Sequence, residues 1–184
     1  MNTMDFFVWL LPVLFMIHEF EEIFMAEPWF SRNKEKIKTI WPKKKPFGLD
    51  YAENYITSSI AIGIFSEFIF VILICLLCAI FQNYYAWYGF LLGFVLAMPL
   101  QHGGVCLKFK GYVPGIVTSA ILFIPCIWVL YQTETILHYG VLEIVLSTAI
   151  INGIGGLITF NLLHKSMASW STWLYKYSKA ETKG

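Results

Sequence analysis

The first apolar segment of the chain carries four ionisable side chains within five residues: His18, Glu19, Glu21 and Glu22. At membrane depth such a group costs on the order of 3 kcal/mol or more, so it is rare unless it has a function or a partner. In a helix with about 100° between successive residues, His18, Glu21 and Glu22 share one face and Glu19 lies at its edge. Histidine and glutamate at this spacing are metal ligands in helical bundles, and they also suit general acid/base catalysis.

The composition indicates that this segment belongs to a membrane protein. Hydrophobic residues make up 58% of the 184 residues, against roughly 45–50% in soluble domains, and only 14% of residues are charged. The mean hydropathy is +0.63. We therefore predict an all-α, polytopic membrane protein with a single transmembrane domain over residues 1–184. Its five transmembrane helices are expected at about residues 5–27, 55–81, 86–107, 113–131 and 139–164.

The distribution of lysine and arginine predicts the orientation of these helices. All 13 basic residues fall in the 28–54 loop, in the 108–112 connection or after residue 164. Because basic loops stay cytoplasmic, we predict a multi-pass protein of the cytoplasmic (inner) membrane with its N-terminus outside and its C-terminus inside. The first segment lacks the basic N-terminal region of a signal peptide, so we expect it to remain as the first helix. The topology accounts for the basic residues, and nucleic-acid binding is not expected.

The 28–54 loop is predicted to be a basic cytoplasmic loop with two alternative structures. It either contains a short amphipathic helix near residues 29–40, with its lysines at anionic headgroups, or is solvated throughout. The sequence favours neither alternative.

Polar side chains of the other helices are expected at the depth of His18. His102 precedes Lys108, at the inner end of the third helix, by six residues or about 9 Å, and Tyr112 opens the fourth helix on the same side. We therefore predict a catalytic group of His18, Glu21, Glu22, His102 and Tyr112, in which the two histidines and two glutamates are also the metal ligands. The predicted substrate-binding residues are Glu53, Asn54, Glu67 and Asn161.

Most of these residues also have a structural interpretation. Glu53 and Asn54 could cap a helix, Asn161 could make a hydrogen bond that packs two helices, and Tyr112 could be an interfacial tyrosine. Glu67 could be a protonated carboxyl group bonded to a neighbouring helix.

Glycine and proline predict how the helices pack. Gly89 and Gly93 of the third helix form a small-xxx-small pair that lets another helix approach closely, and Gly153, Gly155 and Gly156 predict the same for the fifth helix. Pro99 and Pro125 are expected to kink the third and fourth helices.

Three motifs occur in order along the chain: His18-Glu19-Phe20-Glu21-Glu22, then His102, then Tyr112-Val113-Pro114-Gly115. This order resembles the HXXEE family of small prokaryotic integral membrane proteins, whose pattern is an HXXEE motif, a further histidine and a YXPG motif. The resemblance implies that His18, Glu21, Glu22, His102, Tyr112, Pro114 and Gly115 are family positions. It supports the site without supplying a reaction.

The function that these residues favour is a membrane enzyme that acts on a lipid-like or hydrophobic substrate at the inner leaflet. A divalent metal, zinc or iron, would imply hydrolysis for zinc and oxidation or desaturation for iron. Two alternatives are a metal-free acid/base isomerase and a proton- or metal-coupled transporter. Transport is disfavoured because the polar residues gather in one half of the membrane and no inverted repeat is visible. A scaffold that recruits partners through its basic loop would leave the buried charges unexplained.

Overall fold

The computed structural model describes residues 3–43, 57–158, 169–170, 172–174 and 176. Within the described chain every element is a helix, and five helical segments are long and apolar enough to cross a membrane, as predicted. The elements are α1 (Thr3–Ile40), α3 (Thr57–Phe81), α4 (Tyr85–Ala97), η1 (Met98–Gly103), α5 (Gly104–Phe109), α6 (Ile116–Leu137) and α7 (Val141–Ile158).

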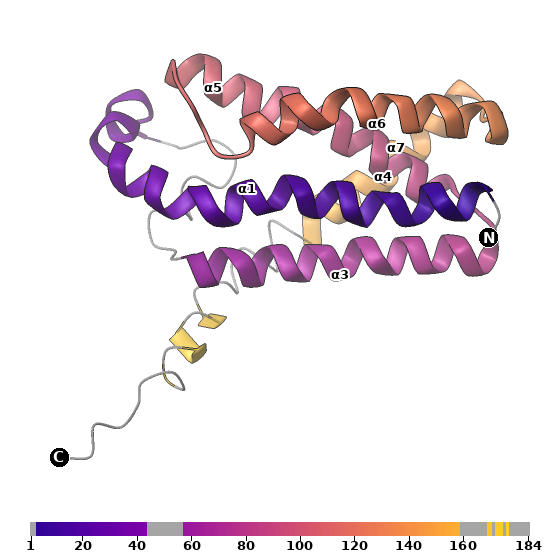
Figure 1. Ribbon diagram of the computed structural model, residues 1–184, viewed down its shortest axis with the longest axis horizontal. Coiled ribbons are helices and arrows are strands. Elements are labelled where there is room, and N and C mark those ends of the chain that lie inside the picture. Colours follow the sequence, from indigo (N-terminus) through magenta and orange to yellow (C-terminus); the bar gives the residue numbers. More distant parts are fainter. Residues whose placement is uncertain (1–2, 44–56, 159–168, 171, 175, 177–184) are drawn as a thin grey trace.

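Helix α1 continues to Ile40, beyond the predicted end at residue 27. Residues 29–40 contain neither glycine nor proline, and they include one arginine, three lysines and one glutamate, all good helix formers. Figure 1 shows the C-terminal part of α1 bent away from the axis of the rest, and Pro28, which lacks an N–H donor, is the local cause of a bend. Residues 28–40 are therefore helix, in agreement with the helical alternative for residues 29–40, and this helix is continuous with the first membrane span. Residues 44–54 lie outside the described residues.

The third membrane span is a continuous helix that changes type where it carries His102. It runs through α4, η1 and α5 from Tyr85 to Phe109, and η1 is a π-helix with Pro99 near its start. Proline removes one backbone hydrogen bond, and a wider π turn accommodates the defect. Because a π turn holds more residues than an α turn, it changes the direction in which His102 points.

Helix α1 lies between α3 and α6 and contacts both (Figure 1). The main apolar core joins α1, α3, α4 and α6 and includes Val8, Leu11, Val71, Trp87 and Leu91. A second apolar cluster joins the C-terminal part of α1 to α5 and the following loop, with Trp29, Ile37, Trp41, Val105, Phe109 and Val113. The polar residues of the HXXEE motif lie along α1 between these two apolar clusters, so water-excluding packing is present on both sides of them.

Helix α7 packs on α4 through the predicted glycine pair. A Cβ atom at Gly89 would lie 2.7 Å from the backbone of Ser147, and one at Gly93 would overlap the side chain of Asn152. The close approach predicted for these two glycines is therefore confirmed. The prediction for the fifth helix is wrong at Gly153 and Gly156, where a Cβ atom would meet nothing within 4 Å among the described residues, and a Cβ atom at Gly155 would make only an ordinary contact with Phe70.

Candidate metal centre

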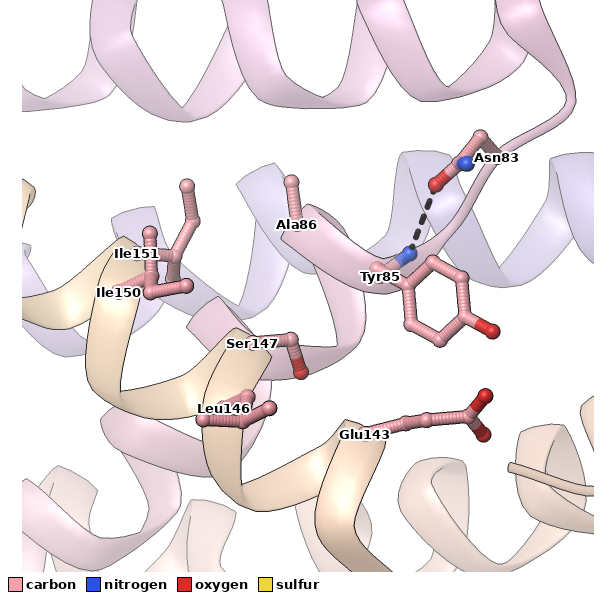
Figure 2. A pocket seen from close by; sticks show the side chains of 8 residues that line it. All are labelled: Asn83, Tyr85, Ala86, Glu143, Leu146, Ser147, Ile150 and Ile151. Carbon is pink, nitrogen blue, oxygen red and sulfur yellow. Dashed lines mark hydrogen bonds between the residues drawn. The ribbon is translucent and has the colours of Figure 1, made fainter. Parts of the chain in front are cut away.

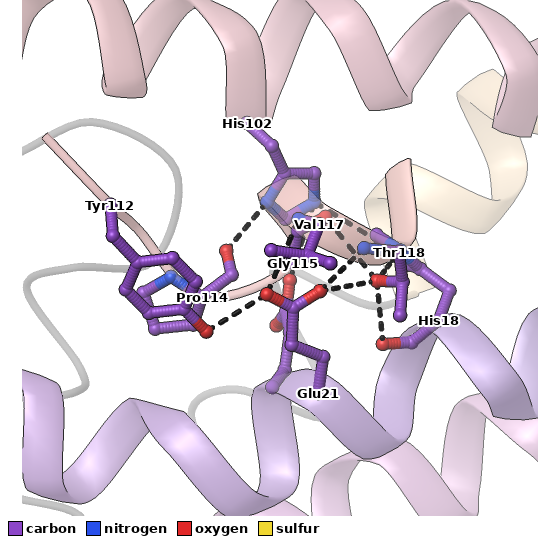
Figure 3. Close-up of polar contacts among 9 residues, drawn as sticks. His18, Glu21, His102, Tyr112, Pro114, Gly115, Val117 and Thr118 are labelled. Carbon is purple, nitrogen blue, oxygen red and sulfur yellow. Dashed lines mark hydrogen bonds and ion pairs between the residues drawn. The ribbon is translucent and has the colours of Figure 1, made fainter. Parts of the chain in front are cut away.

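Three predicted site residues, His18, Glu22 and His102, place one possible ligand atom each close to the other two. Nε2 of His18 lies 3.2 Å from Nε2 of His102, and Nε2 of His102 lies 3.3 Å from Oε1 of Glu22. The three ligand atoms all lie within 4.8 Å of one another. The two imidazole rings, which come from α1 and η1, are arranged edge to face, with centroids 4.8 Å apart and planes at 78° (Figure 3). This His/Glu/His group could hold a metal ion.

Two helical elements position these three side chains: α1 carries His18 and Glu22, and η1 carries His102. His18 and Glu22 are four residues apart on α1, so they point to the same side of that helix. The ring of His18 packs edge-on against Phe94, with ring centroids 5.4 Å apart, and only 3% of the residue is exposed. The side chains of His102 and Glu22 are 14% and 31% exposed, so the group is closed at His18 and open at Glu22.

The second nitrogen of each histidine has its own partner. Nδ1 of His102 lies 3.0 Å from the carbonyl oxygen of Pro114, and Nδ1 of His18 lies 3.1 Å from Oγ1 of Thr118. A carbonyl oxygen only accepts hydrogen bonds, so Nδ1 of His102 is the protonated nitrogen and donates. A neutral His102 ring therefore presents a bare Nε2 to His18 and Glu22.

Glu21 has a different environment from Glu22, although both lie on the same face of α1. Its Oε2 atom accepts hydrogen bonds from the backbone N–H (2.7 Å) and the hydroxyl group (2.6 Å) of Thr118. Its Oε1 atom accepts from the hydroxyl group of Tyr112 at 2.8 Å and from the backbone N–H of Val117 at 3.3 Å. Glu21 thus caps the N-terminus of α6 and is not part of the His/Glu/His group.

Tyr112 lies in the loop before α6 and donates to Glu21. Burial and the hydrogen bond to Glu21 raise the pKa of this phenol well above its usual range. The indole N–H of Trp29 donates to the backbone oxygen of Tyr112 at 2.7 Å, which fixes the loop against α1. Tyr112 was predicted as a catalytic group, and the structure places its hydroxyl on Glu21.

Gly115 explains why the loop can approach His102 so closely. Its φ of 84° lies in the left-handed region, where glycine is favoured, and a Cβ atom at this position would overlap the ring of His102. It would also lie 3.0 Å from Oε1 of Glu22. The glycine of the YXPG motif is therefore a direct neighbour of the candidate metal centre.

Of the four predicted substrate-binding residues, the structure describes only Glu67. Glu67 of α3 is half-buried and interacts electrostatically with Glu22 and with the buried Glu19. The predicted substrate-binding residues Glu53, Asn54 and Asn161 lie outside the described residues.

Sequence reasoning missed Thr118, which contacts both His18 and Glu21. A signal was present, because Thr118 is in the first turn of the helix that Pro114 and Gly115 begin. Exposed N–H groups there attract a carboxylate.

A cavity of about 400 Å³ lies at the other end of the bundle (Figure 2). Its walls come from Asn83, the start of α4 and α7, and the side chain of Asn83 accepts a hydrogen bond from the backbone N–H of Tyr85 in this wall. Tyr85 and His102 are separated by seventeen residues of one helical span, or about 25 Å. This cavity is therefore separate from the His/Glu/His group.

Comparison with known proteins agrees with the motifs. A family described as "Protein of unknown function with HXXEE motif" matches residues 9–130, about two thirds of the chain. No curated protein and no solved structure matches the chain. The matched segment begins within α1 and ends within α6, so it contains His18, Glu21, Glu22, His102 and the YXPG motif. The chain is a membrane-spanning member of the HXXEE family.

Proposed function

We propose that this protein is an integral membrane enzyme that binds one divalent metal ion through His18, Glu22 and His102 and acts on a lipid-like substrate. The proposal depends on a single observation, the opposed Nε2 atoms of His18 and His102 at 3.2 Å with Oε1 of Glu22 beside them. At this distance one Nε2–H can donate to the other Nε2, and when both nitrogens are unprotonated their lone pairs repel, so a cation bound by both removes an unfavourable contact.

The spacing of the three atoms supports a metal ion. Nitrogen and oxygen ligands at about 2.0–2.1 Å from a tetrahedral zinc ion lie about 3.3–3.4 Å apart. The separations of 3.2 Å between the two histidine nitrogens and 3.3 Å between His102 and Glu22 are close to this value. Only a small movement of Glu22 toward His18 would be needed to complete three of the four positions.

The ligand types support zinc or iron. Two histidines and one glutamate bind zinc in hydrolases, and two histidines and one carboxylate bind iron in oxygenases, in each case with positions left open. A bound metal ion would polarise an oxygen atom of the substrate or activate water. The partial exposure of Glu22 provides the side from which a substrate could approach.

A lipid-like substrate is supported by the surroundings of the group. Leu100, in the same π turn as His102, is 68% exposed, and Phe20 and Phe24, on the face of α1 opposite His18 and Glu22, are 46% and 64% exposed. Such apolar side chains contact acyl chains in a membrane. The basic residues that follow on α1 (Arg32, Lys34, Lys36 and Lys38) favour the inner leaflet of the cytoplasmic membrane for this end of the bundle.

Metal-free acid/base catalysis is the second candidate, and the 3.2 Å contact between Nε2 of His18 and Nε2 of His102 favours it as well. One proton shared by the two Nε2 atoms would also relieve their repulsion, and the pair could then exchange that proton with a substrate. The substrate class and the residues are unchanged in this alternative.

The test compares the detergent-purified protein with His18→Ala and with His138→Asn as a matched control. His138 ends α6 with a left-handed backbone, which asparagine tolerates. After mild chelation and reloading, we expect about one zinc or iron atom per chain in the wild type and the control, and none in His18→Ala.

The proteins are then incubated in vesicles of inner-membrane phospholipids, and the lipids are compared by mass spectrometry. Lipid conversion that requires both His18 and the metal supports the enzyme. Conversion without metal supports acid/base catalysis. Metal uptake into the vesicles with unchanged lipids contradicts the enzyme and supports transport.

A further inference from the structure

We propose that Thr118 is a positioning residue that fixes the ring orientation and the tautomer of His18, and that Glu21 controls this tautomer through the Thr118 hydroxyl group. This inference rests on the proposed metal site. It assigns a role to a threonine that lies outside the HXXEE and YXPG motifs and has no contact with the metal-ligand atoms themselves.

The first step concerns the single proton of the Thr118 hydroxyl group. Oγ1 lies 2.6 Å from Oε2 of Glu21, its shortest contact, and 3.1 Å from Nδ1 of His18. Glu21 accepts from three other donors, so it acts as a carboxylate acceptor toward Thr118 as well. The hydroxyl therefore donates to Glu21 and has only lone pairs to offer to His18.

The second step concerns the imidazole of His18. Because Oγ1 of Thr118 can only accept from it, Nδ1 of His18 carries the proton and donates. A neutral ring then has its lone pair on Nε2, the atom that faces His102. Without Glu21, the hydroxyl could turn its proton toward Nδ1, and the ring would carry its own proton on Nε2, where a metal cannot bind.

The third step compares the two histidines. His102 donates to a backbone carbonyl, that of Pro114, so its tautomer does not depend on any side chain. His18 depends on a chain of two side chains, Thr118 and Glu21. Groups that hold a ligating histidine in this way typically contribute about 10–100-fold to metal affinity. Removing the Thr118 hydroxyl should thus affect His18 and leave His102 unchanged.

The experiment measures the affinity for cobalt(II), followed by its absorption spectrum, in wild type, Thr118→Val and Thr118→Ser. Valine keeps the shape of threonine and removes the hydroxyl group, whereas serine keeps the hydroxyl group. We expect Thr118→Val to bind cobalt about 10–100-fold more weakly and Thr118→Ser to bind it close to the wild-type affinity. Equal affinities of the wild type and Thr118→Val would overturn the proposal.

A second readout does not depend on the metal. Nitrogen-15 chemical shifts of the histidines in the metal-free protein distinguish a protonated from a bare ring nitrogen. We expect a protonated Nδ1 and a bare Nε2 on His18 in the wild type, with this preference lost in Thr118→Val and in Glu21→Gln. The glutamine amide can donate to Oγ1 and so releases the hydroxyl proton for His18, which provides a second variant if Thr118→Val does not fold.

The two readouts separate the failure of this inference from the failure of the proposed metal site. Absence of cobalt binding by the wild type would contradict the metal site, and the tautomer of His18 would still decide the role of Thr118. Cobalt binding by the wild type with an Nε2-protonated His18 in the metal-free state would contradict the role of Thr118 alone.

Discussion

Replacing Gly115 by alanine tests the contact between the YXPG loop and the candidate metal centre. At a φ of 84° an alanine side chain is strained, which costs about 1–3 kcal/mol. For a chain of this size each kcal/mol lowers the unfolding temperature by about 2–4 °C. The added Cβ atom would also overlap the ring of His102, so this ring must move away from His18 and Glu22. Displacement of one of three ligands should weaken metal binding at least about tenfold, equivalent to about 1.4 kcal/mol.

The matched control for this substitution is Gly103→Ala. Gly103 directly follows His102 and has a helical φ of −63°, and a Cβ atom there would meet none of the described residues within 4 Å. We expect it to leave the metal affinity unchanged and to stabilise the helix by up to about 1 kcal/mol. Affinity is measured by cobalt titration and stability by thermal unfolding in detergent. If Gly115→Ala binds cobalt as tightly as Gly103→Ala, the close contact between the loop and His102 is not needed for the site, and the reasoning is refuted.

Two further predictions concern packing and pH. Gly89→Ala should destabilise the bundle by about 1–3 kcal/mol, because its Cβ atom would lie 2.7 Å from the Ser147 backbone. The control is Gly153→Ala, whose Cβ atom would meet none of the described residues within 4 Å, and equal thermal stabilities of the two variants would contradict the α4–α7 packing. Tyr112 has a raised pKa in the folded protein, so its stabilising contribution should be complete below about pH 10, the pKa of a free phenol, and should decline at higher pH. The difference in stability between the wild type and Tyr112→Phe, measured from pH 7 to pH 11, should therefore be constant at first and then shrink, and a difference that grows with pH would contradict the hydrogen bond to Glu21.

The sequence predicted that His18, Glu22 and His102 would lie close together, but it did not predict that Glu21 and Glu22 would have different partners. Helical periodicity puts His18, Glu21 and Glu22 on one face, and the depth of His102 followed from the basic residues of its loop. Periodicity treats Glu21 and Glu22 as equivalent, however. Only the position of α6 shows that Glu21 meets the free N–H groups of a helix start, whereas Glu22 meets a histidine.

Two features of the fold were predicted only in part from local patterns. A helix near residues 29–40 was one of two alternatives, but its continuity with the first helix was not predicted. The extension of α1 to Ile40 is stabilised by the apolar cluster that joins Trp29 and Ile37 to Phe109 and Val113, residues far apart in the sequence. The π turn at η1 follows from Pro99, which the sequence marked as a kink. Pro99 alone did not indicate that the helix would respond with a wider π turn, or that this turn would carry His102.

X-ray absorption spectroscopy of the metal-loaded protein tests the central claim most directly, because it reports the atoms bound to the metal. The account predicts two imidazole nitrogens and at least one oxygen at about 2.0–2.2 Å in the wild type. It predicts one imidazole nitrogen in His102→Ala. A wild-type spectrum without imidazole ligands, or one that His102→Ala leaves unchanged, would contradict a metal site formed by His18, Glu22 and His102.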